Sequence, residues 1–167
     1  MAVRKSLSYS KKHNRPYTRV SKVKSKSYIK VVPPNKVVKY NIGNQRAYVD
    51  GKLPFILSLI SDEMIVIKDL SIEAARQVLT KNLETRLMGK FYLWVKIHPH
   101  HILRNNKAAA GAGADRLSTG MKQSFGIVEG RAAQVLRGQE LFMIACDSES
   151  TVRFARQAFS MTKAKLP

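Results

Sequence analysis

Three of the four histidines lie within four residues, in the stretch HPHH at 98–101. Imidazole nitrogens are common metal ligands and proton carriers, so such a cluster raises the hypothesis of a metal site or of catalysis. The spacing argues against a metal, because an extended chain sends His98 and His100 to one side and His101 to the other. Carboxylates are also absent between residues 86 and 114. We expect packing or RNA contact here; an RNA-processing or RNA-modifying enzyme that uses these histidines is the alternative.

Two further stretches resemble catalytic or cofactor motifs without fulfilling them. AGAGADR at 110–116 is glycine-rich, but it has no third glycine at the dinucleotide-binding spacing, and no GK[ST] occurs in the chain. Cys146 is the single cysteine and lies in an apolar stretch, where a thiol is usually a small buried hydrophobe. We therefore predict no catalytic residue, no metal and no cofactor, and we expect the protein not to be an enzyme.

Charge is the strongest signal in the chain. Thirty Lys and Arg against eleven Asp and Glu give a net charge of +19, and residues 1–49 hold 13 of the basic residues and no acid. Such a chain is suited to a polyanionic partner, since Lys and Arg neutralise phosphates while Tyr and His offer stacking faces to unpaired bases. The predicted RNA-binding residues are Arg4, Lys5, Lys11, Lys12, Arg15, Tyr17, Arg19, Lys22, Lys24, Lys26, His98, His101, Arg104, Lys107, Arg116 and Lys122.

Composition narrows the class of protein further. A hydrophobic content of 44% over 167 residues suits one domain. The longest apolar runs fall well short of the roughly 20 residues that span a membrane, and the basic N-terminus is not followed by the apolar core of a signal peptide. We expect a soluble, cytoplasmic protein with no membrane partner.

The domain organisation follows from where periodic patterns begin. Residues 1–35 show no sustained period and end at a Pro-Pro pair, so we predict an extended basic arm that is disordered by itself, followed by one α+β domain at 36–167. Within it, residues 105–126 form a long glycine-containing loop. Strands are expected at 37–42, 55–60, 64–68, 91–97, 132–137 and 140–146, the last two as a hairpin around Gly138, with a short strand or turn at 48–52.

Two main helices are expected to pack on these strands. Ser71 is a candidate N-cap for the first, in which apolar residues recur at helical spacing from Ile72 to Leu87. Asp147 or Ser148 begins the second, which runs to about Met161. In that helix Val152, Ala155 and Phe159 should face inward, with Arg153, Arg156 and Lys163 on another face. The fold class is a two-layer α+β domain with a mixed or antiparallel sheet.

Several segments resemble those of a known family. They are RPYTR at 15–19, SIEAARQVL at 71–79, GKFYLWVKIHPHHILRNNK at 89–107, AGADRLSTGMKQSFG at 112–126 and the final AKLP. In them the chain resembles the universal large-subunit ribosomal protein family L-sixteen, in its archaeal and eukaryotic branch, L-ten-e. The similarity covers nearly the whole chain, and AGADRLSTGM is its most specific part.

The resemblance implies a structural protein of the large ribosomal subunit that binds large-subunit ribosomal RNA. It also implies a place near the A-site transfer RNA, with the loop matching residues 102–120 directed toward the peptidyl-transferase region. Carried over, Arg104, Lys107 and Arg116 would contact or position RNA there, and the arm would thread RNA. The implied partners are ribosomal RNA, the 5S ribosomal RNA region, A-site and P-site transfer RNA, and neighbouring ribosomal proteins.

Overall fold

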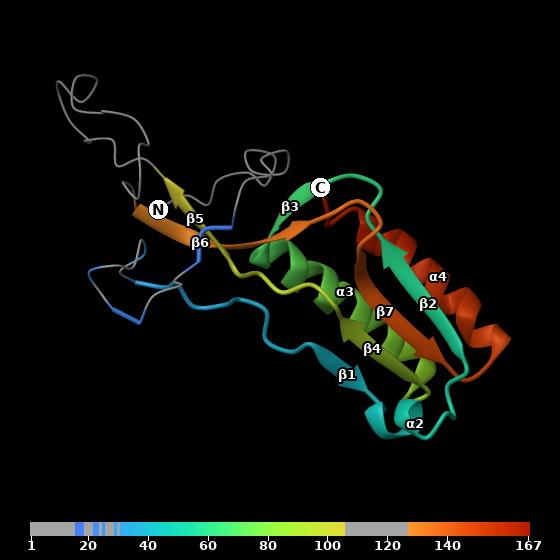
Figure 1. Cartoon of the computed structure of the whole chain (residues 1–167). Helices are drawn as coiled ribbons and strands as arrows, with labels where there is room; N and C mark the ends of the chain where they lie inside the picture. Colours follow the sequence, from blue (N-terminus) through green and yellow to red (C-terminus); the bar gives the residue numbers. More distant parts are fainter. Residues whose placement is uncertain (1–15, 19–21, 24, 26–28, 30, 106–126) are drawn as a thin grey trace.

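The structure, a computed structural model, describes residues 16–18, 22–23, 25, 29, 31–105 and 127–167. Its elements are β1 (Asn41–Gly43), α2 (Gln45–Val49), β2 (Phe55–Ile60), β3 (Ile65–Lys68), α3 (Asp69–Leu87), β4 (Phe91–Val95), β5 (His101–Asn105), β6 (Ile127–Val135), β7 (Glu140–Cys146) and α4 (Glu149–Lys163). Helices and antiparallel strands are interspersed, as Figure 1 shows, and this confirms the predicted α+β class.

Four strands form the larger sheet, in the order β1-β4-β7-β2, with every neighbouring pair antiparallel. Figure 1 shows α3 and α4 on one face of this sheet, which gives the two predicted layers. Side chains of β4 alternate between the two faces of the sheet. Leu93 and Val95 join the main core under the helices, while Tyr92 and Trp94 lie on the opposite face. Burial of this apolar layer provides most of the driving force for folding.

The two helices bury the residues that periodicity predicts. In α3 the residues Ile72, Leu79 and Leu83 are almost fully buried. The predicted N-cap is wrong by three residues: α3 begins at Asp69, with Lys68 as its N-cap, so Ser71 lies inside the first turn. The Asp69 carboxylate accepts the N–H of Leu70 at 2.9 Å. A free N–H group of the first turn is therefore satisfied by Asp69, two residues before Ser71.

Helix α4 begins at Glu149, and its N-cap is Ser148, one of the two residues that the sequence offered for that position. The Ser148 hydroxyl and the side chain of Thr151 form a reciprocal capping box, which satisfies donors at the helix start. Ala155 and Phe159 are buried and Val152 is partly buried against the core, which confirms the predicted inner face. The opposite, exposed face of this helix bears the charged residues Arg153, Arg156 and Lys163.

Three strands form a second, smaller sheet in the order β3-β6-β5, which the sequence did not predict. The expected hairpin of residues 132–137 with 140–146 is wrong, because β6 pairs with β3 and β5 while β7 pairs with β2 and β4. Ser61 explains the separation. It accepts the N–H of Gly138 at 2.8 Å and donates its own N–H to Gln139 at 3.0 Å, so the turn pairs with the end of β2.

Two further expectations need correction. At residues 48–52, expected as a short strand or turn, Tyr48 and Val49 are the last residues of α2, and Asp50 and Gly51 form the turn after it. The Asn44 side chain caps that helix by accepting the N–H of Ala47 at 3.0 Å. Of the strand expected at 37–42, Asn41 and Ile42 pair with β4, and the carbonyl of Tyr40 accepts the N–H of Val95 at 2.8 Å. The N–H of Val38 instead binds the Glu73 carboxylate, so a side chain takes the place of a neighbouring strand.

Candidate nucleic-acid interface

Strands β5 and β6 form a two-stranded projection at one end of the domain (Figure 1). Asn105, the last residue of β5, lies opposite Ile127, the first of β6, and Arg104 lies opposite Val128. The ends of the predicted loop are therefore held side by side by the sheet. Residues 106–126 themselves lie outside the described residues.

Part of the predicted arm lies against the edge of β5. The N–H of Tyr17 donates to Nδ1 of His101 at 2.9 Å, and its carbonyl accepts the N–H of Ile102 at 2.9 Å. Tyr17 thus binds β5 much as a residue of an added strand would. The sequence predicted RNA contact for Tyr17 but did not predict this contact within the protein.

The side chains of Tyr17 and Arg104 also meet. The Arg104 guanidinium lies 4.1 Å from the centroid of the Tyr17 ring, and its Nη2 donates to the phenol oxygen at 2.6 Å. An arginine held over an aromatic ring keeps its positive charge, and a guanidinium charge attracts phosphate. Two predicted RNA-binding residues, 87 positions apart, are thereby brought together.

His101 acts here as a neutral acceptor. Burial, and then repulsion from His100, lowers its pKa below the ordinary value. Since Nδ1 accepts the Tyr17 N–H, a neutral ring carries its proton on Nε2. The arm is therefore fastened by an imidazole that must stay uncharged.

The other histidines have separate environments. His98 is exposed and stacks on Tyr40, with 4.2 Å between the ring centroids. The N–H of His100 donates to the His98 carbonyl at 3.0 Å, which turns the chain between the two side chains. Across the described ranges, no three His, Cys, Asp or Glu side chains gather as metal ligands would.

Residues 33–38, where the predicted arm joins the domain, are called the arm root below. Contacts that the sequence did not predict hold the arm root against the domain. Nε of Arg131 donates to the carbonyl of Pro33 at 2.7 Å. The N–H of Lys36 donates to the Asp69 carboxylate, and the N–H of Val38 to Glu73, each at 3.3 Å. Both acids lie in the first turns of α3. The signal in the sequence that could have indicated this contact is the pair of acids at the start of the helix, in a chain whose N-terminal arm has only basic charges.

The two acids differ in protonation energetics. Burial raises the pKa of Asp69, although the N–H groups of Leu70 and Lys36 oppose that shift. The pKa of Glu73 is lowered, mainly by hydrogen bonds from Arg76, whose Nη2 lies 2.5 Å from the carboxylate. Glu73 is thus a stable anion at neutral pH, and it anchors both an arginine and the backbone of the arm root.

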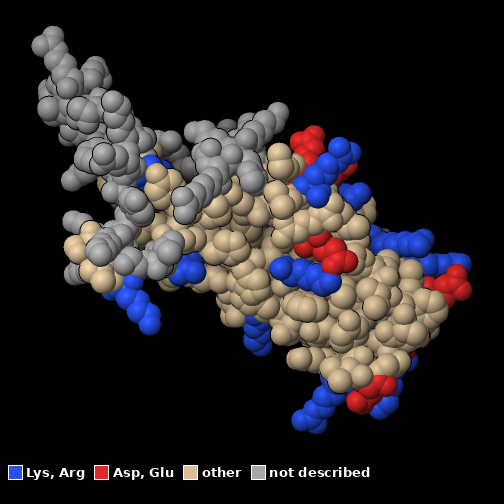
Figure 2. Space-filling model, in the orientation of Figure 1, with Lys and Arg blue, Asp and Glu red and all other residues tan. Residues whose placement is uncertain are grey.

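Of the predicted RNA-binding residues, Tyr17, Lys22, His98, His101 and Arg104 are described, and Lys22 and His98 are exposed. The other eleven lie outside the described residues: Arg4, Lys5, Lys11, Lys12, Arg15, Arg19, Lys24, Lys26, Lys107, Arg116 and Lys122. Figure 2 shows Lys and Arg beside this end of the domain without a comparable gathering of acids in that view.

Two remaining features show no catalytic arrangement. Cys146 is fully buried and burial raises the pKa of its thiol, which confirms the expected packing role.

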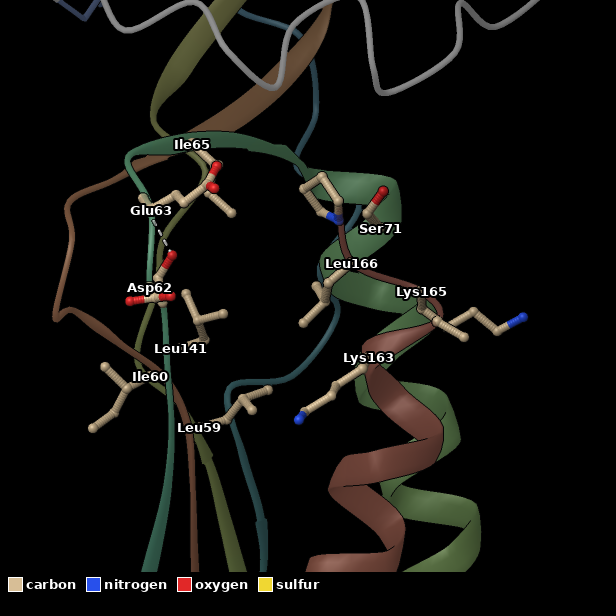
Figure 3. Close-up of a pocket in the computed structure, with 13 residues that line it drawn as sticks. Leu59, Ile60, Asp62, Glu63, Ile65, Ser71, Leu141, Lys163, Lys165 and Leu166 are labelled. Atoms are coloured by element: carbon tan, nitrogen blue, oxygen red, sulfur yellow. Dashed lines mark hydrogen bonds between the residues drawn. The ribbon is translucent and has the colours of Figure 1, made fainter.

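A cavity of about 640 Å³ lies between the end of β2 and the chain after α4 (Figure 3). Leu59, Leu141 and Leu166 supply apolar lining, and in Figure 3 the Lys163 side chain points toward Leu59 while that of Lys165 points away from the cavity. No helix in the described ranges is long and apolar enough to cross a membrane.

The fold and the interface define a small α+β domain to which a basic arm is fastened, an arrangement typical of RNA-binding proteins. The sequence profile of ribosomal protein L16p/L10e matches residues 12–167. The chain is 38% identical over its whole length to "Large ribosomal subunit protein uL16" of Methanococcus maripaludis, covering 91% of that protein. It is 37% identical to the protein of the same name from Pyrobaculum arsenaticum, over its whole length and 88% of the relative. The chain therefore belongs to the ribosomal protein L16p/L10e family.

Membership confirms the resemblance drawn from the sequence, and the relatives named above are archaeal. The chain is a ribosomal protein and not an enzyme. The histidine alternative gains no support from the described site, where His101 binds the arm and His98 stacks on Tyr40.

Proposed function

We propose that this chain is a structural constituent of the large ribosomal subunit that binds large-subunit ribosomal RNA. The family supports this function, as does the +19 charge, which needs a polyanion for its neutralisation. The most direct structural support is the contact of Tyr17 with His101 and Arg104. It brings the predicted arm to the same end of the domain as the root of the predicted loop, so both basic segments can contact one RNA region.

The arm and residues 105–126 would serve as two RNA-contacting extensions on a domain at 36–167. Tethering the arm at Tyr17 and again at Pro33 reduces the conformational entropy that RNA binding must overcome. The sixteen predicted residues, with Arg104 at the loop root, are the contacts proposed for phosphates and unpaired bases.

The finer part of the proposal concerns translation. We place the loop of residues 105–126 toward the A-site transfer RNA and the peptidyl-transferase region, with A-site and P-site transfer RNA, the 5S ribosomal RNA region and neighbouring ribosomal proteins as partners. The resemblance of AGADRLSTGM supports this placement. No chemical step is required of the protein, which would position RNA, and the site of action would be the cytoplasmic large subunit.

Ribosomal RNA binding is tested with the full chain and a large-subunit RNA fragment. A protein that neutralises six to ten phosphates loses about 10³ to 10⁵ in affinity between 50 and 200 mM salt. The chain should also co-sediment with large subunits and dissociate at high salt. Binding that is insensitive to salt, or equal binding to duplex DNA, would contradict the proposal.

The transfer-RNA placement needs a separate test. Large subunits would be reconstituted with the wild-type chain or with K107A/R116A, and the affinity of A-site transfer RNA would be measured. We expect normal incorporation and weaker A-site binding for the variant. Unchanged A-site binding at full incorporation would contradict the placement and leave ribosomal RNA binding standing.

A further inference from the structure

The outer face of α4 carries charge that the arm and loop do not explain. From Ser150 to Lys165 the chain has four basic residues and no acid. Arg153, Arg156 and Lys163 are exposed, and none forms an ion pair with a described residue. Figure 2 shows Lys and Arg, with some acidic atoms beside them, along the border where Figure 1 places α4, at the opposite end of the molecule from β5.

The folding of the domain does not require this row. Buried residues on the other side of the helix, such as Ala155 and Phe159, hold α4 to the sheet. Lys163 lies in the last turn, where a cation favours the helix dipole. Arg153 and Arg156 lie in the first and middle parts, where the dipole gives no such benefit, and like charges three residues apart disfavour a helix.

Helix α3 adds an arginine beside this row. Nη1 of Arg86 donates to Oε1 of Gln157 at 2.7 Å, and its guanidinium lies 5.3 Å from the centroid of the exposed Phe154 ring. Two residues of α4 thus hold Arg86 against the helix. The surface formed by Arg86, Arg153, Arg156 and Lys163 is called the α4 basic surface below.

Its dimensions and chemistry suit a nucleic-acid backbone. Arg153 and Lys163 are ten residues apart, so along the helix axis they are separated by about 15 Å, which is enough to reach several phosphates. Guanidinium groups bind phosphate oxygens in a bidentate manner. An acid-free row is complementary to a polyanion, and the absence of aromatic side chains other than Phe154 favours backbone contact over base stacking.

We propose that the α4 basic surface binds the phosphate backbone of a second segment of ribosomal RNA. The inference rests on the proposed function and extends it: the domain would bridge two RNA segments, one at the arm and β5 and one at α4. A rigid sheet-and-helix body between the two surfaces would fix the distance between these segments.

The test compares two double variants of the full chain that lose the same charge. R153Q/R156Q changes the α4 basic surface, and K39Q/R46Q changes two exposed cations near β1 and α2. Each is titrated with large-subunit ribosomal RNA over a range of salt concentrations. For R153Q/R156Q, the slope of log affinity against log salt should become shallower by about 1.4 to 1.8, which corresponds to two phosphate contacts. We expect little change for K39Q/R46Q, and R153K/R156K should restore most of the slope.

The outcomes separate the two proposals. Wild-type protein that fails to bind the RNA would overturn the proposed function and this surface with it. Wild-type binding with an unchanged slope in R153Q/R156Q, or with equal loss in both double variants, would overturn the α4 surface alone. Unchanged RNA binding with poor incorporation into subunits would assign the surface to an acidic protein partner and also overturn the RNA assignment. Unfolding midpoints within a few degrees of wild type are the folding control.

Discussion

The backbone N–H of Tyr17 donates to Nδ1 of His101, 84 residues further along the chain, at 2.9 Å. This bond and the reciprocal one from Ile102 to the Tyr17 carbonyl attach the arm to the outer edge of β5. The Arg104 guanidinium packs on the ring of the same tyrosine. The orientation of this predicted RNA-binding arginine therefore depends on whether the arm is bound to β5.

Acidification should release this contact. The pKa of His101 is lowered in the folded protein, mainly by burial, so the unfolded chain binds more protons between the folded value and the ordinary value of about 6.5. The contribution of neutral His101 to stability is thus complete above about pH 6.5 and is lost as pH falls below that value. We expect faster amide exchange at Tyr17 at pH 5.5 than the intrinsic rate predicts from pH 7.5. H101F should remove the pH dependence, and its persistence would contradict the assignment.

Replacing Arg104 with alanine should loosen the arm and weaken RNA binding. The cation–π contact and hydrogen bond with Tyr17 are worth roughly 1 kcal/mol, or about fivefold in the docking equilibrium. The measurement is the amide exchange of Tyr17 together with affinity for ribosomal RNA. R104K keeps the charge but loses the fork, so it should recover only part of both. An R104A variant with wild-type exchange would refute the coupling.

Glu73 should be far more important for stability than another acid of the same helix. E73A removes partners from Arg76 and from the Val38 N–H in a nearly buried place, which should cost about 2 to 4 kcal/mol in the free energy of unfolding. E84A, at an exposed position of α3, is the matched control and should change it by less than about 0.5 kcal/mol. Urea unfolding gives both values, and similar losses would show that the contacts of Glu73 with Arg76 and with the Val38 N–H do not stabilise the fold.

The pKa shift of Glu73 adds a pH test. Because its folded pKa is lowered, its contribution is present above the unfolded value near 4.5 and is lost as pH falls below that value. The difference in unfolding free energy between wild type and E73Q should therefore shrink from pH 7 to pH 3. A constant difference across this range would show that the charge of Glu73 is not what stabilises the fold.

Gly43 should tolerate no side chain. Its φ is +90°, and an added Cβ would lie 2.4 Å from the carbonyl oxygen of Phe91, so β1 and β4 would have to separate. G43A should cost more than about 2 kcal/mol. Gly51 is the control, with φ of +75° but no atom within 4 Å of an added Cβ. G51A should cost only the conformational term of about 1 to 2 kcal/mol. Equal losses in urea unfolding would show that the close approach to Phe91 has no energetic consequence.

Much of the fold follows from local patterns. Apolar residues at helical spacing identified the buried face of α3, and the pair Asp147 and Ser148, of which Ser148 is the N-cap, identified the start of α4. The limits of β2 and β7 agree with the expected strands at 55–60 and 140–146. These features depend on residues close in sequence, so short-range periodicity and capping chemistry are enough to predict them.

Partner choice could not be predicted in the same way. The short link at Gly138 suggested that β6 and β7 form a hairpin, but Ser61 takes up the turn and each strand pairs within a different sheet. The strand β5 was missed because HPHHILRN mixes histidines and a proline with few β-branched residues, and its pairing with β6 spans residues 106–126. Pairing energy between distant strands is not visible in a local window.

The sequence by itself determined that the protein is a basic α+β domain of a ribosomal family, because charge, periodicity and the AGADRLSTGM stretch are properties of the linear chain. Only the tertiary structure decided that Tyr17 meets His101 and Arg104, and that Asp69 and Glu73 bind the backbone of the arm root. The physical reason is that these contacts satisfy buried polar groups whose partners are dozens of residues away. Folding must bring those groups together before they become favourable.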